Sequence, residues 1–248
     1  MSGDPIQIQN NFERVLTEIE QVRKTSRYSS KHVNLVVVTK GQTVDVMRAA
    51  YSAGVRMFGE NYPEETEQKI AALGELQEAN WHMIYHLQSR KARIVASYFN
   101  MMHSLDSLDI ARRLNERLSL INRNLPVLIE VNVGGETSKF GFEASNPAEW
   151  ARLLEDFAKI ADLSCLAVRG LMTMPPLYEL AEKSRPNFSK MRNLQSFLRK
   201  NLPNVCWDEL SMGTSYDYQV AVEEGATYVR IGTAIVGERQ KPLRSERK

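Results

Sequence analysis

Short apolar runs alternate with longer amphipathic segments along most of this chain. In the first run, residues 33–39, six of the seven residues are apolar or β-branched, and a lysine and a glycine follow directly. Runs of this kind predict buried strands, whereas longer segments with apolar residues three and four positions apart predict helices. We expect eight strands, near residues 33–39, 55–58, 81–85, 100–103, 127–133, 165–171, 205–210 and 227–231.

The helices between these runs have recognisable starts. Asp4 and Pro5 match an N-cap followed by proline at the first helical position, Asn146 and Pro147 repeat the pattern, and Asp106 can cap a third helix. Apolar stripes with helical spacing follow these starts, formed by Ile8, Phe12, Val15, Leu16, Ile19 and Val22, by Trp150, Leu153, Leu154 and Phe157, and by Ile110, Leu114, Leu118 and Ile121.

The alternation of strands and helices predicts a parallel sheet. Eight strand–helix units in 248 residues have the size of a (β/α)8 (TIM) barrel, and we expect one such domain over residues 1–238, followed by a basic, solvated tail at 239–248. An open doubly wound sheet is the alternative. Against it, the loop after the first strand reads TKGQT rather than GxGxxG, and the chain has no P-loop.

Composition and charge narrow the classes of function. The chain is 43% hydrophobic and 25% charged, as soluble globular proteins are, and its net charge of +2 argues against strong electrostatic binding of nucleic acid. No apolar run has membrane-spanning length, and the first residues have neither the basic start nor the apolar core of a signal peptide. We expect a cytoplasmic protein that binds neither nucleic acid nor membrane. We also expect a monomer, because no long exposed apolar stripe stands out.

The two cysteines, Cys165 and Cys206, lie far apart, and neither belongs to a CxxC or a mixed His and Cys spacing. We interpret both as small buried apolar residues in a reducing compartment. We therefore expect no metal site.

Polar residues gather where the predicted strands end, which is where barrels of this type place their chemistry. Lys40 follows the first strand, and a partly desolvated amine there would have a lowered pKa and could attack carbonyls. Ser215, Gly232 and Thr233 follow the last two strands, whose loops frequently bind phosphate through backbone N–H groups. Alone, each feature also fits a solvent-reaching lysine or residues that end strands and cap helices. Together they indicate a phosphorylated carbonyl ligand, and pyridoxal 5′-phosphate (PLP) fits that description.

Arg230 lies in the eighth predicted strand, one face of which must point into the barrel. A buried arginine needs an acceptor or an anion, so an ion pair with Glu60 or Glu130 is one interpretation. Placed against a pyridine nitrogen, Arg230 would instead disfavour protonation of the ring. This would weaken the ring as an electron sink and make transamination less favourable.

The remaining polar candidates are His82, His86, His103, Tyr62, Tyr216 and Lys139. We interpret His82 as a core histidine, whereas His86 and His103 lie near strand ends and are open to either interpretation. The two tyrosines fit packing at a barrel rim. Lys139 fits an anion-binding or a solvated lysine. We assign no catalytic role to any of them.

Seven stretches, in order and spanning nearly the whole chain, make it similar to a known family. They are VVVTK (36–40), FGENYPEE (58–65), WHMIYHLQSRK (81–91), EVNVGGETSKFGF (130–142), RGLMTMPP (169–176), ELSMGTSYDYQVAVEEG (209–225) and VRIGTAIVG (229–237). In these stretches the chain resembles the pyridoxal phosphate homeostasis protein family, whose barrel is similar to the N-terminal domain of alanine racemase. The chain departs from the residues usual in the family at Tyr85, Arg90 and Thr214.

The resemblance implies a barrel that holds PLP as a Schiff base on Lys40. It places Arg230 against the pyridine nitrogen, Asn61 close to the ring, and the phosphate in the loops after the last two strands. With Ser211 added from the segment ELSMGTS, the expected cofactor-binding residues are Lys40, Asn61, Ser211, Ser215, Arg230, Gly232 and Thr233.

Members of this family resemble vitamin B6 carriers or regulators more than enzymes. A racemase needs acid–base groups on both faces of the substrate carbon, and relatives with this fold supply the second group from a separate β domain, for which eight strand–helix units leave no residues. We therefore expect a non-catalytic protein of intracellular vitamin B6 homeostasis, with PLP-dependent apo-enzymes as candidate recipients. A weak PLP-dependent amino-acid racemase is the alternative, and a phosphate-binding barrel enzyme without a B6 cofactor is the third hypothesis.

Overall fold

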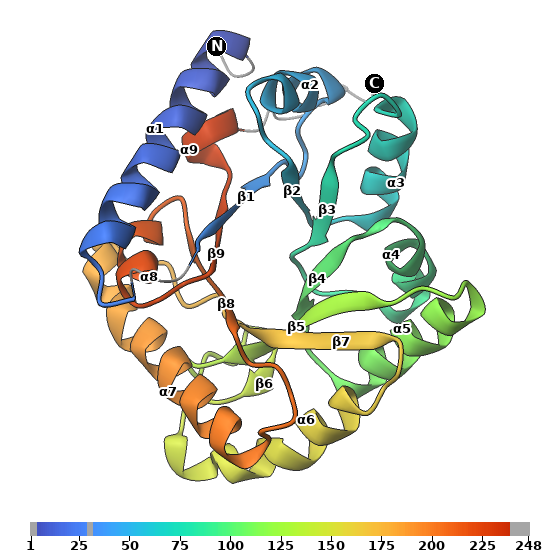
Figure 1. Cartoon of the computed structure of the whole chain (residues 1–248), viewed down its shortest axis with the longest axis vertical. Helices are drawn as coiled ribbons and strands as arrows, with labels where there is room; N and C mark the ends of the chain where they lie inside the picture. Colours follow the sequence, from blue (N-terminus) through green and yellow to red (C-terminus); the bar gives the residue numbers. More distant parts are fainter. Residues whose placement is uncertain (1–3, 29–31, 239–248) are drawn as a thin grey trace, which may run out of the picture.

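Eight parallel strands close into a barrel in the computed structural model, which describes residues 4–28 and 32–238. The barrel strands are β1 (Asn34–Val38), β2 (Met57–Glu60), β3 (Asn80–Met83), β4 (Met101–Leu105), β5 (Leu125–Asn132), β7 (Leu166–Met172), β8 (Glu209–Thr214) and β9 (Tyr228–Ile231). Closure comes from the pairing of β9 with β1 and of β4 with β5, and helices surround the ring (Figure 1). The predicted (β/α)8 barrel is confirmed, and the open doubly wound sheet is excluded.

The helices follow the strands in the order that the sequence predicts. They are α1 (Pro5–Thr25), α2 (Val44–Ser52), α3 (Pro63–Ala72), α4 (Ala92–Tyr98), α5 (Leu108–Leu120), α6 (Leu153–Ala161), α7 (Arg185–Asn201), α8 (Tyr218–Glu223) and α9 (Thr233–Val236), with short 3-10 helices η1 (Ser89–Lys91), η2 (Pro147–Arg152) and η3 (Ala181–Ser184). Helix α1 packs against α8 and α9, so the first helix of the chain lies beside the last two (Figure 1). The expected basic tail at 239–248 lies outside the described residues.

Three strand predictions need correction. The apolar pattern places the seventh strand at 205–210, but β8 begins at Glu209. Trp207, which the pattern counts in that strand, instead packs beside Phe157 of α6 and donates its indole N–H to the Leu202 carbonyl. The second strand lies at 57–60 rather than 55–58. A short ninth strand, β6 (Phe142–Glu143), pairs with the end of β5 and was not predicted.

The helix caps agree with the sequence at α1 and differ at two other starts. The Asp4 side chain accepts from the Ile6 N–H, as expected. Helix α5 is capped by Ser107 and not by Asp106, whose carboxylate instead forms a hydrogen bond with the His86 ring. Asn146 caps the 3-10 helix η2, which leads into α6.

The large apolar core lies between the barrel and its helices, whereas the barrel interior is partly polar. Met101, Leu128 and Met172 come from three different strands and pack with Tyr228 from a fourth, which places this small cluster inside the ring. His82, His103, Ser211 and Arg230 share this interior and are all buried. Polar side chains therefore occupy part of the barrel interior, which in such folds is typically filled with branched apolar residues.

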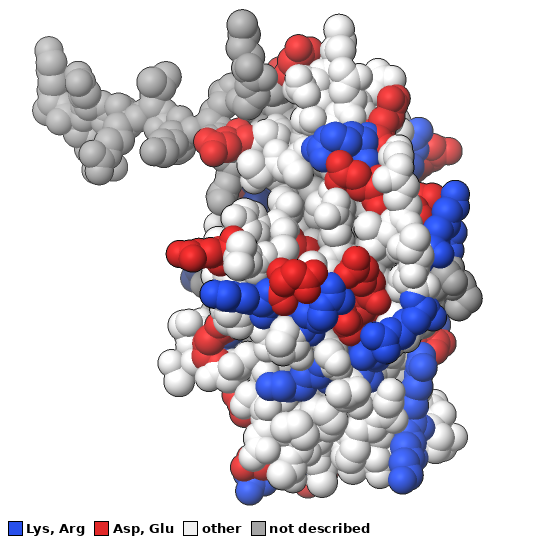
Figure 2. Space-filling model, turned by 90° about the vertical axis from the view of Figure 1, so that its left-hand side faces the viewer, with Lys and Arg blue, Asp and Glu red and all other residues white. Residues whose placement is uncertain are grey.

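Opposite charges are interspersed on the face formed by α1, α7 and α8 (Figure 2). Several of them form ion pairs, among them Arg14 with Glu18 and Arg192 with Glu224. In the described ranges, no helix is long and apolar enough to cross a bilayer. Cys165 and Cys206 are free thiols, but both are partly exposed, so the prediction that they are buried is wrong.

Candidate functional site

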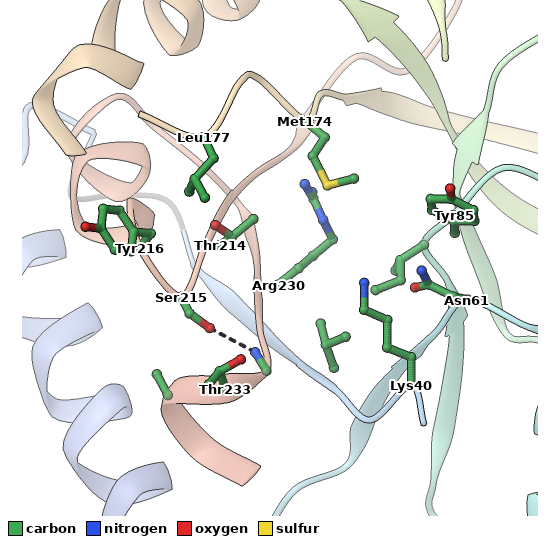
Figure 3. A pocket seen from close by; sticks show the side chains of 14 residues that line it. Lys40, Asn61, Tyr85, Met174, Leu177, Thr214, Ser215, Tyr216, Arg230 and Thr233 are labelled. Atoms are coloured by element: carbon green, nitrogen blue, oxygen red, sulfur yellow. Dashed lines mark hydrogen bonds between the residues drawn. The ribbon is translucent and has the colours of Figure 1, made fainter. Parts of the chain in front are cut away.

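A cavity of about 580 Å³ opens where the barrel strands end. Six of the seven expected cofactor-binding residues line it, namely Lys40, Asn61, Ser215, Arg230, Gly232 and Thr233. Figure 3 shows the Lys40 side chain extending into the cavity from one wall and Ser215 and Thr233 on the other, with Arg230 between them. The amine and the hydroxyl-rich loops therefore face one shared space.

Lys40 lies two residues after the end of β1, and the residues on both sides of it are held in place. The Lys69 ammonium of α3 donates to the Thr39 carbonyl at 2.8 Å, and the Gly41 N–H donates to the Glu65 carboxylate at 2.9 Å. Gly41 has a φ of +67°, a conformation that suits glycine. These contacts fix the backbone from which the Lys40 side chain extends.

A buried ionic network supports this turn. Glu60, at the end of β2, is fully buried, and one of its carboxylate oxygens accepts from both Lys69 and the Thr39 hydroxyl at 2.7 Å. Lys69 also pairs with Glu65 at 2.6 Å. Burial raises the pKa of Glu60, and the Lys69 charge opposes that rise. The network joins β1, β2 and α3 beneath Lys40.

The loops after β8 and β9 meet at a single hydrogen bond. The Gly232 N–H donates to the Ser215 hydroxyl at 3.1 Å, so the hydroxyl hydrogen of Ser215 remains available to a ligand (Figure 3). The N–H groups of Thr233 and Ala234 begin α9 and have no partner within that helix. Gly213, with a φ of +91°, brings β8 so close to α8 that an added Cβ would lie 2.6 Å from the Ala221 Cβ.

Arg230 is buried in β9, and no carboxylate of the described residues forms an ion pair with it. It donates to the Ser211 hydroxyl at 2.5 Å and to the Thr173 carbonyl at 2.9 Å. Burial lowers the pKa of Arg230 to about 10, which leaves it charged at neutral pH. The ion pair with Glu60 or Glu130 that the sequence left open does not form; Glu130 acts on Arg230 only through its field.

Ser211 does not line the cavity but lies beneath Arg230. Because a guanidinium only donates, the Ser211 oxygen accepts from Arg230. Ser211 also lies 2.8 Å from the His103 ring, which in turn lies 2.9 Å from the His82 ring. Burial lowers the pKa of His82 to about 4, and burial beside His82 and Arg230 holds the pKa of His103 well below its usual value, so both rings are neutral at pH 7. The interpretation of His82 as a core histidine agrees with this placement, and His103 joins it.

Asn61 presents an unused acceptor. Its side-chain oxygen is buried and has no hydrogen-bond partner among the described residues, although the residue lines the cavity. A buried polar atom without a partner is costly, so a ligand that donates a hydrogen bond here would be stabilised. Of the two rim tyrosines, Tyr216 lines the cavity, whereas Tyr62 is not one of its lining residues.

A second, smaller chamber of about 190 Å³ adjoins the main cavity and contains Glu130. Burial and the neighbouring charge of Asp106 raise the pKa of Glu130 to about 7, while Arg230 and Lys139 oppose the rise. The His86 ring lies 2.5 Å from the Asp106 carboxylate and stacks on Phe140 at 4.0 Å, so it is a structural hydrogen-bonding residue at the chamber wall.

Replacing Glu130 by glutamine is expected to change how stability depends on pH. A carboxyl whose pKa is raised on folding stabilises the protein fully below its unfolded pKa, and this contribution is lost as pH rises through about 7. Glutamine cannot ionise, so Glu130→Gln should be more stable than the wild type by up to roughly 3 kcal/mol near pH 8, with little difference near pH 4. Urea unfolding at both pH values measures this; an equal difference at both would contradict it.

The chain is similar to known proteins over most of its length. A family model described as the alanine racemase N-terminal domain matches residues 11–240. The pyridoxal phosphate homeostasis protein of Aquifex aeolicus is 38% identical over 93% of this chain and 99% of its own length. That of Haemophilus influenzae is 39% identical over 94% of this chain and 96% of its own. The chain belongs to the family of pyridoxal phosphate homeostasis proteins.

Solved structures agree with membership in this family. PipY of Synechococcus elongatus, a structure with PLP bound, is 31% identical, covers 93% of this chain and all of its own, and superposes with a TM-score of 0.80. An alanine racemase of Clostridium difficile is 14% identical with a TM-score of 0.65, and this chain covers 58% of it. At that identity, the racemase supports only the shared barrel fold.

Lys69 was not predicted to be part of this site. The burial of Lys69 could have been predicted, because Lys69 lies three residues after Thr66 and therefore on the same buried face of α3. A lysine on a buried face needs a carboxylate partner. The pattern does not say which strand end supplies that partner.

Proposed function

We propose that this protein binds PLP, linked through its aldehyde to the Lys40 amine, and serves intracellular vitamin B6 homeostasis as a carrier. The observation that carries the proposal is that Lys40 and the Ser215 and Thr233 loops line one cavity of about 580 Å³. A PLP-bound structure of a relative 31% identical supports the same ligand.

The residues present fit this cofactor. Lys40 supplies the amine, and the Ser215 hydroxyl together with the first N–H groups of α9 supplies donors for a phosphate. The unpartnered oxygen of Asn61 offers an acceptor beside Lys40. When bound, PLP would supply an aldehyde that could react reversibly with the Lys40 amine, with one water released on binding and taken up again on release. This reversibility suits a protein that both holds and delivers its ligand.

Arg230 favours a carrier over an enzyme. With a pKa of about 10 it stays charged and can only donate a hydrogen bond, so it disfavours protonation of a pyridine nitrogen placed against it. PLP chemistry on amino acids uses the ring as an electron sink. A weak racemase remains the alternative function; incubation with L-alanine followed by chiral analysis separates the two, and robust turnover would overturn the carrier assignment.

We expect borohydride reduction of the yellow, PLP-loaded protein to fix the ligand on the peptide that contains Lys40. Mass spectrometry of the digested protein measures the site and the mass of the adduct together. A protein that stays colourless after incubation with PLP would contradict the proposal and favour a phosphate-binding barrel enzyme without a B6 cofactor.

We further propose that the protein works in the cytoplasm as a monomer of one domain, residues 1–238, and passes PLP to apo-enzymes. Both cysteines are free thiols, which suits a reducing compartment. Size-exclusion chromatography with light scattering tests the monomer. Reactivation of a PLP-dependent apo-enzyme by the loaded protein, faster than the spontaneous loss of PLP, tests the transfer.

A further inference from the structure

The small chamber beside the main cavity has its own lining and its own charges. It shares Ile84, Tyr85 and Met174 with the main cavity, and the last two are visible at its border in Figure 3. Its other walls include Phe140 and His86, whose rings stack at 4.0 Å. The proposed PLP site accounts for Lys40 and the phosphate loops but uses neither charged residue that faces this chamber.

Those two residues carry opposite charges and do not pair with each other. Glu130 of β5 is only 7% exposed, and its Oε2 atom has no hydrogen-bond partner among the described residues. Lys139, from the loop after β5, lines the same chamber, and its charge lowers the pKa of Glu130 from a distance. The two form no ion pair in the described part of the chain. A space therefore separates a buried carboxyl group from an ammonium group.

We propose that this chamber binds a small free α-amino acid, with the ammonium group toward Glu130 and the carboxylate toward Lys139. A zwitterion satisfies both charged residues at once, whereas an amine or a carboxylic acid alone would satisfy only one. Charge-assisted hydrogen bonds of this kind are among the stronger polar contacts. The inference goes beyond the proposed function and does not require PLP to be present.

The size and the local field agree with this ligand. A volume of 190 Å³ corresponds to about six water molecules at ~30 Å³ each, and alanine has six non-hydrogen atoms. Asp106, whose Oδ1 is buried and has no hydrogen-bond partner among the described residues, adds negative potential at the Glu130 end. This potential favours an ammonium group there and disfavours a carboxylate, which sets the orientation of the ligand.

The charged groups around Glu130 also predict a pH dependence. Asp106, paired with His86, disfavours the Glu130 carboxylate, and Arg230 and Lys139 favour it. Since an ammonium ligand binds the ionised carboxylate, affinity for the amino acid should fall as the pH drops below about 7.

Equilibrium dialysis of the cofactor-free, full-length protein against labelled L-alanine tests the inference. We expect saturable binding that weakens by roughly tenfold or more in Glu130→Gln and in Lys139→Met. Alaninamide and N-acetylalanine, which each lack one of the two charges, should compete poorly. Glu155→Gln and Lys159→Met are the matched controls, because these residues pair with each other on the exposed face of α6, and both should bind alanine as the wild type does.

The inference would be overturned by the absence of saturable binding, by equal competition from the two analogues, or by unchanged affinity in both chamber variants. Binding lost in Lys40→Ala but kept in the chamber variants would place alanine in the main cavity and also overturn it. Colour formation with PLP is measured on the same samples. Loss of colour with retained alanine binding would count against the proposed PLP function and leave the chamber assignment standing.

Discussion

Replacing Lys40 by alanine is expected to abolish the adduct that borohydride fixes and the yellow colour of the loaded protein. The reason is chemical, because no other lysine lines the main cavity in the described part of the chain. The phosphate donors of Ser215 and Thr233 remain in this variant, so PLP should still bind, but reversibly and with weaker affinity. Absorbance titration, followed by dialysis with and without borohydride, separates the covalent from the non-covalent ligand.

Two further variants make the Lys40 result specific. Lys40→Arg keeps a positive charge but cannot form the imine, so it should also lose the fixed adduct. Lys91→Ala removes a lysine of η1 that pairs with Glu64 outside the cavity, and it should keep the adduct. A fixed adduct that persists in Lys40→Ala would assign the reactive amine to another residue, with Lys139 of the adjoining chamber the first to examine.

The barrel was predictable because its determinants are local. Strands such as β1 lie in short apolar runs, and helix starts such as Asp4–Pro5 use capping that involves only neighbouring residues. The predicted position of the seventh strand was wrong because it depends on a contact that is not local. Trp207 is apolar and follows Val205, but its indole packs on α6, and this contact between distant elements shifts the strand to Glu209.

The part of the site that could be predicted consists of residues at strand ends, because the strand ends of a barrel lie close together. Lys40, Asn61 and Thr233 follow three different strands, and the fold alone brings them to one cavity. Ser211 was placed in the cofactor site because it belongs to the same segment as Ser215. In a strand, residues four apart lie on the same face but about 13 Å apart along the chain. Ser211 is therefore deeper in the barrel, where it holds Arg230 and continues to His103.

Charge pairing between elements could not be predicted, since it depends on which side chains meet across the packed layers. The sequence left Glu60 as a possible ion-pair partner of Arg230, but in the structure the Glu60 carboxylate pairs with Lys69 of α3. Among the described residues, Arg230 then donates only to Ser211 and the Thr173 carbonyl, which leaves its remaining N–H groups for the cavity. Because Glu60 pairs with Lys69, Arg230 is available to a ligand.

Replacing Lys69 by methionine is expected to have the largest effect on stability. The substitution keeps an apolar side chain of similar length but leaves Glu60 fully buried without its cation. Breaking a buried pair in this way typically costs about 3–5 kcal/mol. The pKa of Glu60 is already raised by burial, so a neutral carboxyl is the less costly state. The loss should be larger near pH 8 than near pH 5, where the carboxyl takes up a proton more readily.

Urea unfolding of Lys69→Met at the two pH values measures the loss, and the double variant Glu60→Gln with Lys69→Met shows its cause. Removing the charge on Glu60 should restore much of the stability, because the cost comes from the unpaired carboxylate. Lys159→Met, which breaks the exposed pair with Glu155, is the control and should change little. Since Lys69 also holds the Thr39 carbonyl, the single variant should form the Lys40 adduct more slowly even where it is folded. A variant as stable as the wild type at both pH values would mean that Glu60 is neutral in the native protein and that Lys69 is not needed to hold Lys40.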